Sequence, residues 1–562
     1  MKQRRLIAQK EYSARTFTWL PLGLMLLFFT ACTEHKRVGE KEVVKAPVDI
    51  DAAAADMIET TLQEEPDSNG QLKSLAIYDP AVITYFYKQG DYKPVWSRKG
   101  VFNAAADSLV QFIQECRSYG LFPDNYSITR LTTLRRLVAD TTKENKLDAS
   151  KWAESDLLLS AAFINIVKDL KKGRLLPDSI SKRDTVLTPQ FYYQQWQAFG
   201  GAMTALAGSL ETKQPRYVAL KEALQSFLQT ARFGTYTYIN PKDSLHLQRL
   251  VAQRLKEEDS ATFSNVHIDS SSVAAAVKKY QTLKGLKETG KLTGALIANL
   301  NNTDNFKFAR IAVNLDRYKQ LQALPQQYVW VNIPTYQLQL WDSGAVMLTS
   351  KVVVGKPQTR TPELTSAISN MITYPQWHIP QSIIKKEILP ALKHDPGYLA
   401  RKGFSLVDGE GNDVNPYGVN WARYENGIPY TVVQGSGDAN ALGVLKFNFP
   451  NKYDVYLHDT NQRYLFSRDK RALSHGCVRV EAWEELANYI LERDNAAGAG
   501  AVPVDSMLTW LSLKEKHVIP VRKRLPVFIR YFTCGAEDGS LHFYEDIYDE
   551  DRKLIDQFFK NK

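Results

Sequence analysis

The stretch Ser474-His475-Gly476-Cys477-Val478-Arg479-Val480 places a single cysteine directly after a glycine, between a histidine and an arginine. A second histidine, His458, lies 19 residues before Cys477, at the end of a strand-like run from 453 to 457. A thiol nucleophile needs a base within reach and backbone N–H groups that can hold an oxyanion. The stretch therefore predicts a cysteine active site in a β-rich domain.

The residues around the cysteine have separate roles in this hypothesis. His458 is the expected general base, because the end of a strand holds a side chain at a defined angle. Gly476 permits a tight turn, and the amides of Gly476 and Cys477 are the expected oxyanion donors. His475 and Arg479 are expected to support the loop. As alternatives, His475 could act as the base, and Arg479 could bind a carboxylate through two hydrogen bonds.

The segment Tyr456-Leu457-His458-Asp459-Thr460, followed by the 474–480 stretch, resembles the active site of bacterial L,D-transpeptidases in order and spacing. The similarity continues outside this segment and covers about 75 to 560. It indicates the large multidomain subgroup, which has a scaffold domain, a peptidoglycan-binding unit, a catalytic domain and a capping subdomain. The other matching stretches are 92–96, 119–123, 328–338, 395–399 and 440–443.

The resemblance implies a specific reaction. Cys477 would attack the amide between the third residue of a peptidoglycan stem, usually diaminopimelate, and a terminal D-alanine, with His458 as general base and acid. An amine of a second stem would then resolve the thioester into a 3–3 cross-link. The family's third catalytic group is the backbone carbonyl after the histidine, here that of Asp459, and Ser474 belongs to the supporting loop. The family uses no metal or cofactor, and carbapenems commonly acylate its cysteine.

Other functions remain open at this point. A cysteine carboxypeptidase or endopeptidase would use the same dyad but pass the stem to water, which a large cap argues against. A sortase-like transpeptidase would place its arginine much farther from the cysteine. A non-catalytic wall-binding lipoprotein would leave the cysteine and histidine unexplained. The acceptor could be a stem, an outer-membrane lipoprotein or a free D-amino acid.

The N-terminus has the pattern of an export signal. Residues 1–31 contain a basic stretch and then an apolar run of 11 residues, from Trp19 to Phe29. This run is too short to span a bilayer, where about 20 residues are needed. The following Ala31-Cys32 resembles a lipobox, which implies lipidation of Cys32; an ordinary cleaved signal is the alternative. We expect a periplasm-facing lipoprotein of the bacterial envelope, held in the outer membrane, with residues 32–72 as a flexible tether.

The chain of 562 residues is too long for one core, so we expect a multidomain α+β protein. Its formal net charge of +10 is not concentrated in any basic block, which argues against a nucleic-acid partner. Apolar residues at helical spacing in 151–172 predict a helix within a helical scaffold, whereas alternation of period two after Tyr328 predicts strands. The expected units are a scaffold at 73–265, a three-helix peptidoglycan-binding-like unit at 266–302, a helical connector at 303–326, a catalytic domain at 327–500 with a capping insertion at about 380–440, and a C-terminal segment at 501–562 that packs on a neighbouring domain.

Two further cysteines, Cys116 and Cys534, lie far from the 474–480 stretch. Each is expected to be a small buried residue, although an exported protein could also join them in a disulfide. The chain has no Cys-x-x-Cys pair, and the spacing of His458, His475 and Cys477 is not that of structural zinc. The sequence therefore predicts no metal site.

Overall fold

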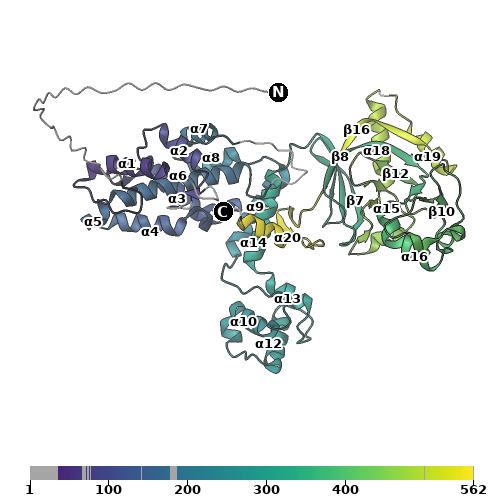
Figure 1. Ribbon diagram of the computed structural model, residues 1–562, viewed down its shortest axis with the longest axis horizontal. Coiled ribbons are helices and arrows are strands. Elements are labelled where there is room, and N and C mark those ends of the chain that lie inside the picture. Colours follow the sequence, from purple (N-terminus) through teal and green to yellow (C-terminus); the bar gives the residue numbers. More distant parts are fainter. Residues whose placement is uncertain are drawn as a thin grey trace, which may run out of the picture.

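The computed structural model describes residues 36–65, 71–72, 75, 77–140, 142–176, 187–498 and 500–560. Figure 1 shows helices α1 to α8 at one end of the molecule and a β-rich domain at the other, with α9, α14 and α20 between them. The expected helical region followed by a β-rich domain is therefore confirmed. Cys32 and the rest of 1–35 lie outside the described residues, so their prediction stays a prediction.

The scaffold is organised around one long helix, α6 (Ala149–Lys171). Asp148 caps it by accepting a hydrogen bond from the backbone N–H of Ser150, and basic residues occupy its last turn. Its apolar side chains, including Leu159, Phe163 and Leu170, are completely buried. The surrounding helices are α1 (Ile50–Leu62), α2 (Pro80–Lys88), α3 (Ala104–Glu115), α4 (Ile128–Ala139), α5 (Lys143–Lys146), α7 (Pro189–Phe199), α8 (Met203–Leu210) and α9 (Pro215–Thr230), with two short hairpins, β1 (Gln71–Leu72) with β2 (Ile77–Tyr78) and β3 (Ser97–Arg98) with β4 (Val101–Phe102).

The expectation of a flexible tether through residue 72 is wrong for residues 50–62. This stretch forms helix α1, which packs against α6. Ala54, Met57 and Ile58 are buried in the same apolar core as the α6 side chains. The apolar residues of this helix are short or few, and the surrounding Asp, Glu and Thr residues conceal their periodicity in the sequence.

The small helical unit begins earlier than residue 266. Helices α10 (Leu247–Glu258), α11 (Ser260–Phe263), α12 (Ser270–Leu283) and α13 (Gly294–Asn301) share one apolar core. Val251 and Leu255 of α10 lie in this core with Val277 and Leu300, so α10 belongs to the unit rather than to the scaffold. Thr293 caps α13 by accepting a hydrogen bond from the N–H of Leu296.

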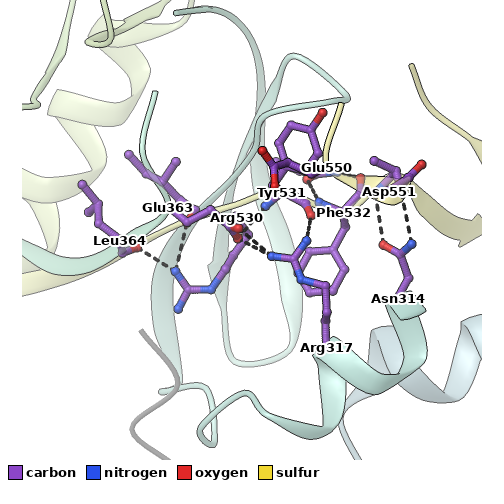
Figure 2. Close-up of polar contacts among 12 residues, drawn as sticks. Asn314, Arg317, Glu363, Leu364, Arg530, Tyr531, Phe532, Glu550 and Asp551 are labelled. Atoms are coloured by element: carbon purple, nitrogen blue, oxygen red, sulfur yellow. Dashed lines mark hydrogen bonds and ion pairs between the residues drawn. The ribbon is translucent and has the colours of Figure 1, made fainter. Parts of the chain in front are cut away.

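The connector is helix α14 (Asp304–Lys319), which is fixed to the catalytic domain by polar contacts. Both carboxylate oxygens of Glu363 accept hydrogen bonds from Arg317, at 2.6 Å. The Asn314 amide exchanges hydrogen bonds of 3.1 Å with Thr533. Figure 2 shows these contacts beside Arg530, which donates to the backbone carbonyl of Leu364 at 2.7 Å. The connector is therefore a structural part of the catalytic domain's edge.

The catalytic domain is built on one large sheet that closes on itself. Its strand order is β14-β7-β15-β13-β12-β8-β16-β5-β6, and β6 also pairs with β7. Inward-facing residues of these strands form a single apolar core with helix α18 (Trp483–Ala496). The strands are β5 (Gln327–Asn332), β6 (Gln337–Asp342), β7 (Ala345–Gly355), β8 (Leu364–Thr373), β12 (Leu445–Asn448), β13 (Leu457–His458), β14 (Ala472–Ser474), β15 (Val478–Val480) and β16 (Val518–Arg530).

The expected insertion forms a separate capping subdomain with its own apolar core. A three-stranded sheet, β10-β11-β9, lies beside a helical segment interrupted by a π-helical turn at Ile384–Ile388. Its elements are β9 (Trp377–His378), α15 (Gln381–Ile383), α16 (Leu389–His394), α17 (Tyr398–Arg401), β10 (Phe404–Val407) and β11 (Thr431–Gln434).

The C-terminal segment is only partly what the sequence predicted. Strand β16 inserts between β8 and β5, so the catalytic domain extends well beyond residue 500. The chain then continues through α20, which packs on α14. Helix α20 thus packs on a neighbouring unit, as expected for the C-terminal segment. The elements of this region are α19 (Val504–Ser512), β16, the hairpin β17 (Cys534–Glu537) with β18 (Ser540–Phe543), and α20 (Asp551–Lys560).

Cys116 and Cys534 are both buried free thiols, in different apolar cores, so the disulfide alternative does not apply. Within the described ranges, no helix combines the length and the apolar character needed to cross a membrane.

Candidate active site

Cys477 lies in a tight turn between β14 and β15. The Ser474 hydroxyl ties the turn together: it accepts a hydrogen bond from the N–H of Gly476 at 3.2 Å and donates to the carbonyl of Cys477 at 2.7 Å. Gly476 has φ +125°, a conformation that a side chain would strain. Thr361 holds the Gly476 carbonyl from outside, at 2.7 Å. The turn is thus fixed from both sides, with a glycine where the backbone requires one.

His458 ends strand β13 and lies in line with two other basic residues. It is opposite Arg479 of β15 and opposite Lys446 of β12, and cross-strand partners point to the same face of a sheet. The imidazole is almost fully buried, at 4% exposure. Burial, followed by the charge of Arg479, lowers the pKa of His458 to about 3. His458 is therefore a neutral imidazole at physiological pH, the form that can accept a proton.

Cys477 and His458 line the same cavity, which has a volume of about 360 Å³. Strand ends and the Cys477 turn form one side, and Trp377 with the 380–383 segment of the cap forms the other. The Cys477 Sγ lies 3.7 Å from the carbonyl oxygen of Asp454. Among the predicted site residues, Ser474, His475, Gly476 and Arg479 line this cavity too.

The surroundings of Cys477 favour the protonated thiol in the resting enzyme. Burial raises the pKa of Cys477, whereas hydrogen bonds from the backbone and phenol of Tyr456 and the charge of Lys446 lower it. Lys446 lies over the Tyr456 ring, 3.9 Å from the ring centroid, and burial lowers its pKa. The pair at rest is thus a neutral thiol beside a neutral imidazole.

Arg479 and His475 make different contacts. The Arg479 guanidinium donates to the Thr460 hydroxyl at 3.1 Å and to the Gln462 side-chain oxygen at 3.0 Å, so it braces the loop that follows His458. His475 turns toward the cap, where its Nε2 lies 2.6 Å from a carboxylate oxygen of Glu387. Neither contact places the residue against the thiol.

The buried Asp459 side chain holds the loop before β12 in place. Its carboxylate accepts hydrogen bonds from the N–H of Val444 and from Arg463, each at 3.0 Å. Burial raises the pKa of this carboxyl. Its backbone carbonyl, the expected orienting group, acts on the imidazole in the direction that raises the His458 pKa. However, the imidazole Nδ1 makes no hydrogen bond of ordinary geometry within the described part of the chain.

Sequence reasoning did not assign roles to Lys446, Trp377 or Glu387. Lys446 carried little signal, because Leu445, Lys446, Phe447 and Asn448 alternate between apolar and polar residues, as in any strand with one polar face. Trp377 and Glu387 come from the cap, more than 70 residues before His458 in the sequence. Only the fold brings them to the cavity.

Residues 326–505 match the family described as the L,D-transpeptidase catalytic domain, and residues 81–224 match a scaffold domain. The chain therefore carries a transpeptidase-type catalytic domain with a cysteine turn and a strand-end histidine. Its catalytic domain, residues 326–505, is of the L,D-transpeptidase type.

A Haemophilus influenzae protein that carries the provisional name L,D-transpeptidase is 39% identical over 247 residues, which are 44% of this chain and 48% of that protein. The chain thus aligns with about half the length of this relative. Two solved structures are more distant: an L,D-transpeptidase from Mycobacterium smegmatis (14% identity, 36% of this chain and 58% of that one, TM-score 0.18) and the catalytic domain of an E. faecium L,D-transpeptidase acylated by ertapenem (14%, 37% and 100%, TM-score 0.16).

Proposed function

We propose that the protein is an L,D-transpeptidase that forms 3–3 cross-links between peptidoglycan stems through a thioester on Cys477. The observation that carries this proposal is one cavity that contains a thiol in a glycine turn, a neutral buried histidine and a wall supplied by the cap. Tetrapeptide stems would serve as both donor and acceptor.

The first half-reaction transfers the stem to the enzyme. Cys477 gives its proton to His458 as its sulfur attacks the carbonyl carbon of the third stem residue. The oxyanion is held by N–H groups of the Gly476–Cys477 turn. The C–N bond then breaks, the nitrogen of D-alanine takes the proton from His458, and a thioester remains.

The second half-reaction releases the thioester to an amine. The side-chain amine of a second stem attacks the thioester carbonyl and gives its proton to His458. The C–S bond breaks, and the sulfur recovers the proton through His458. A new amide joins the two third residues, and the enzyme returns to its neutral pair.

The resting protonation state supports general-base catalysis rather than a preformed ion pair. A thiolate–imidazolium pair would need a thiol pKa below that of the imidazole, whereas burial shifts the two groups in the opposite directions. The proton would therefore move from sulfur to nitrogen as the sulfur attacks. Lys446 and the hydrogen bonds from Tyr456 would stabilise the negative charge that develops on the sulfur.

The cap favours transfer over hydrolysis. Trp377, Ile383 and neighbouring cap residues line one side of the cavity beside Cys477. Glu387 of the cap also contacts His475, which belongs to the turn that carries Cys477. A covered thioester is less accessible to water than to a bound amine. Hydrolysis of stems by the same dyad is the second candidate function, and the product separates the two.

We further propose that Cys32 is lipidated and that the protein faces the periplasm from the outer membrane. Support comes from the basic and apolar pattern of 1–31 and from the polar Thr33 that follows Cys32. Metabolic labelling with palmitate, compared between the wild type and Cys32→Ala, measures the modification. Equal labelling of the two proteins would contradict it.

The central proposal is tested with purified protein in two measurements. Mass spectrometry after incubation with a carbapenem should show one adduct, which Cys477→Ala should lack. Incubation with purified disaccharide-tetrapeptides should yield cross-linked dimers and free D-alanine. Tripeptides without dimers would establish the hydrolase instead, and an adduct that persists in Cys477→Ala would exclude Cys477 as the nucleophile.

A further inference from the structure

A second cavity of about 330 Å³ lies between the scaffold and the catalytic domain, and it shares no residue with the Cys477 cavity. We call it the junction cavity. Helix α9 contributes Arg216, β5 and β6 contribute Trp330, Gln337 and Trp341, and the region of the β17–β18 hairpin contributes Glu537 and Tyr544. Its volume lies at the lower end of the range of about 300 to 1,000 Å³ that is usual for small-ligand sites.

The alternation along two strands creates this cavity. β5 and β6 pair so that Tyr328 faces Trp341, Trp330 faces Gln339 and Asn332 faces Gln337. The residues between them fill the core of the closed sheet: Val329, Val331, Leu338 and Leu340. In a sheet with one buried face, the other face ordinarily meets water and carries charged or small polar groups. Here that face carries aromatic rings and amides and lies under α9 and the β17–β18 hairpin.

The walls of the junction cavity are held in fixed positions. The Arg216 guanidinium lies 4.4 Å from the ring centroid of Trp330 and 4.6 Å from that of Trp341, so it keeps the two indoles apart. Phe532 exchanges hydrogen bonds of 2.8 and 3.0 Å with the Asn332 amide. Figure 2 shows the network around Arg317 and Asn314 that anchors this same segment to α14. The cavity is therefore preformed.

Polar groups remain available inside it. The Gln337 side chain is partly exposed and makes no side-chain hydrogen bond in the described part of the chain. Gln339 uses its oxygen for Arg216 and for Trp341, at 3.3 and 3.2 Å, which leaves its amide nitrogen. Asn332 is satisfied by Phe532 and is not available. The Gln337 and Gln339 amides thus line a cavity whose walls also carry aromatic rings and the charged side chains of Arg216 and Glu537.

The charges select a neutral ligand. Arg216 makes no ion pair among the described residues, and Glu537 is the carboxylate of the same cavity, so the two formal charges cancel. An acyl chain would leave the amides without partners, at a cost of about 1 to 3 kcal/mol each. A neutral molecule with an apolar face and hydrogen-bonding edges fits the lining better. A pyranose ring has this shape, since its C–H face packs on aromatic rings while its hydroxyl and acetamido groups bond to amides.

We propose that the junction cavity binds an N-acetylated aminosugar of a glycan strand. The site deepens the proposed function, on which the choice of glycan rests: a strand held at the junction would keep the attached stems near the Cys477 cavity. Binding here involves no covalent step. The glycan and the stem would be recognised at separate places on one chain.

The test uses the full chain in detergent and N,N′,N″-triacetylchitotriose as the probe. Isothermal titration or saturation-transfer NMR should show saturable binding, and maltotriose, which lacks acetamido groups, should bind at least five times more weakly. Gln337→Met, which keeps the volume but removes the amide, should weaken binding at least fivefold. Ala536→Phe, which fills the cavity, should abolish it. Gln111→Met, on the exposed face of α3, is the matched control and should change nothing.

Carbapenem acylation of Cys477 is measured on the same samples. It reports folding of the catalytic domain and separates the two proposals. Normal acylation in Ala536→Phe with lost sugar binding supports the site. Unchanged sugar binding in Ala536→Phe, or no binding by the wild type, overturns the site but leaves the transpeptidase proposal standing. Absence of acylation in the wild type counts against the transpeptidase proposal alone.

Discussion

At the scale of single residues, the site is a row of three basic side chains beside one thiol. Lys446, His458 and Arg479 lie in register on three neighbouring strands. Their mutual repulsion, added to burial, keeps His458 neutral, while Lys446 favours the anionic form of Cys477. The two cations thus act on the two catalytic groups in the directions that catalysis needs.

Removal of the Lys446 charge should slow acylation at neutral pH. In Lys446→Met the pKa of Cys477 rises further, and the acylation rate at pH 7 should fall roughly tenfold. The rate of carbapenem acylation measured between pH 6 and 10 should rise at higher pH in the variant than in the wild type. Lys351→Met, an exposed lysine of β7, should leave the profile in place. A profile that does not move in Lys446→Met would show that this charge has no effect on the thiol.

The choice of His458 rather than His475 as the general base can be tested, because the two histidines have very different surroundings. His458→Ala should reduce acylation about 10²- to 10⁴-fold, because no other group lining the Cys477 cavity can take the proton as readily. His475→Ala should change acylation only a few fold, since His475 contacts Glu387 rather than the thiol. Stopped-flow acylation rates of the two variants provide the comparison. The opposite ranking would assign the base to His475.

Much of the catalytic turn could be predicted from the sequence, because its residues are neighbours in the chain. Gly476 had to be a glycine for its backbone conformation, and Ser474 is close enough to bond across the turn. The positions of Trp377 and Glu387 could not be predicted in this way. Their contacts depend on the cap folding back over the strands, and a helical segment alone does not say what it covers.

At the scale of elements, the cap contacts the catalytic turn through its π-helical segment. The turn at Ile384–Ile388 carries Glu387, which reaches His475 at 2.6 Å. π-Helical turns re-aim side chains within a helix and are common at functional sites. The contact is at the surface of the cap, so its stability contribution is at most about 1 kcal/mol.

Glu387→Gln should therefore affect the fate of the thioester more than its formation. A cap held less firmly would admit water, and the ratio of tripeptide to cross-linked dimer should rise two- to fivefold. The rate of carbapenem acylation should remain within twofold of the wild type. Chromatography of products from disaccharide-tetrapeptides measures the ratio. Glu410→Gln, at an exposed turn of the cap, is the matched control. An unchanged ratio in Glu387→Gln would mean that this contact does not control water access.

The long helix α6 carries a buried carboxyl that should make the scaffold sensitive to pH. Asp156 accepts hydrogen bonds from Tyr87 and from the backbone N–H groups of Val95 and Trp96. Burial nevertheless raises its pKa to about 6. The folded state thus binds this proton more tightly than the unfolded state, so stability from this group is full below about pH 4 and is lost as pH rises through about 6.

The size of this loss should be about 2 kcal/mol between pH 4 and 7. Chemical denaturation of the wild type and of Asp156→Asn at both values measures it. The Asn variant also loses hydrogen bonds at every pH, so the pH-dependent part of the difference is the relevant quantity. A stability difference between the two proteins that is the same at pH 4 and pH 7 would contradict the raised pKa.

At the scale of the whole molecule, the chain leaves the catalytic domain and returns to the scaffold. Strand β16 completes the closed sheet, and α20 then packs on α14 and shares an apolar cluster with Leu175 of the scaffold. The sequence could predict a multidomain protein and a β-rich unit, since these depend on local periodicity. It could not place β16, because Phe528 of this strand pairs with Trp330 of β5, 198 residues earlier in the chain, by tertiary contact alone.

Helix α20 connects the scaffold and the catalytic domain through the packing of Phe558. This ring is 1% exposed and packs with Leu175, Ala312 and Val313 at the junction. The Arg174 guanidinium, buried beside it, donates to the Phe558 backbone carbonyl at 3.1 Å. Arg310 forms an ion pair with Asp551 at the start of the same helix, at 2.6 Å. The C-terminal helix is thus held at both ends by residues from distant parts of the chain.

Phe558→Ala should loosen this junction without altering the active site. Loss of a buried phenylalanine costs about 3 to 5 kcal/mol, and here the loss falls on the cluster in which α20 contacts both Leu175 of the scaffold and helix α14. Calorimetry should show the scaffold and catalytic domain unfolding at separate temperatures. Carbapenem acylation of Cys477 should persist, because the cavity lies on strands and cap residues that do not touch Phe558. Lys553→Ala, exposed on the same helix, should behave as the wild type. A single unfolding transition at the wild-type temperature in Phe558→Ala would show that α20 does not join the two halves.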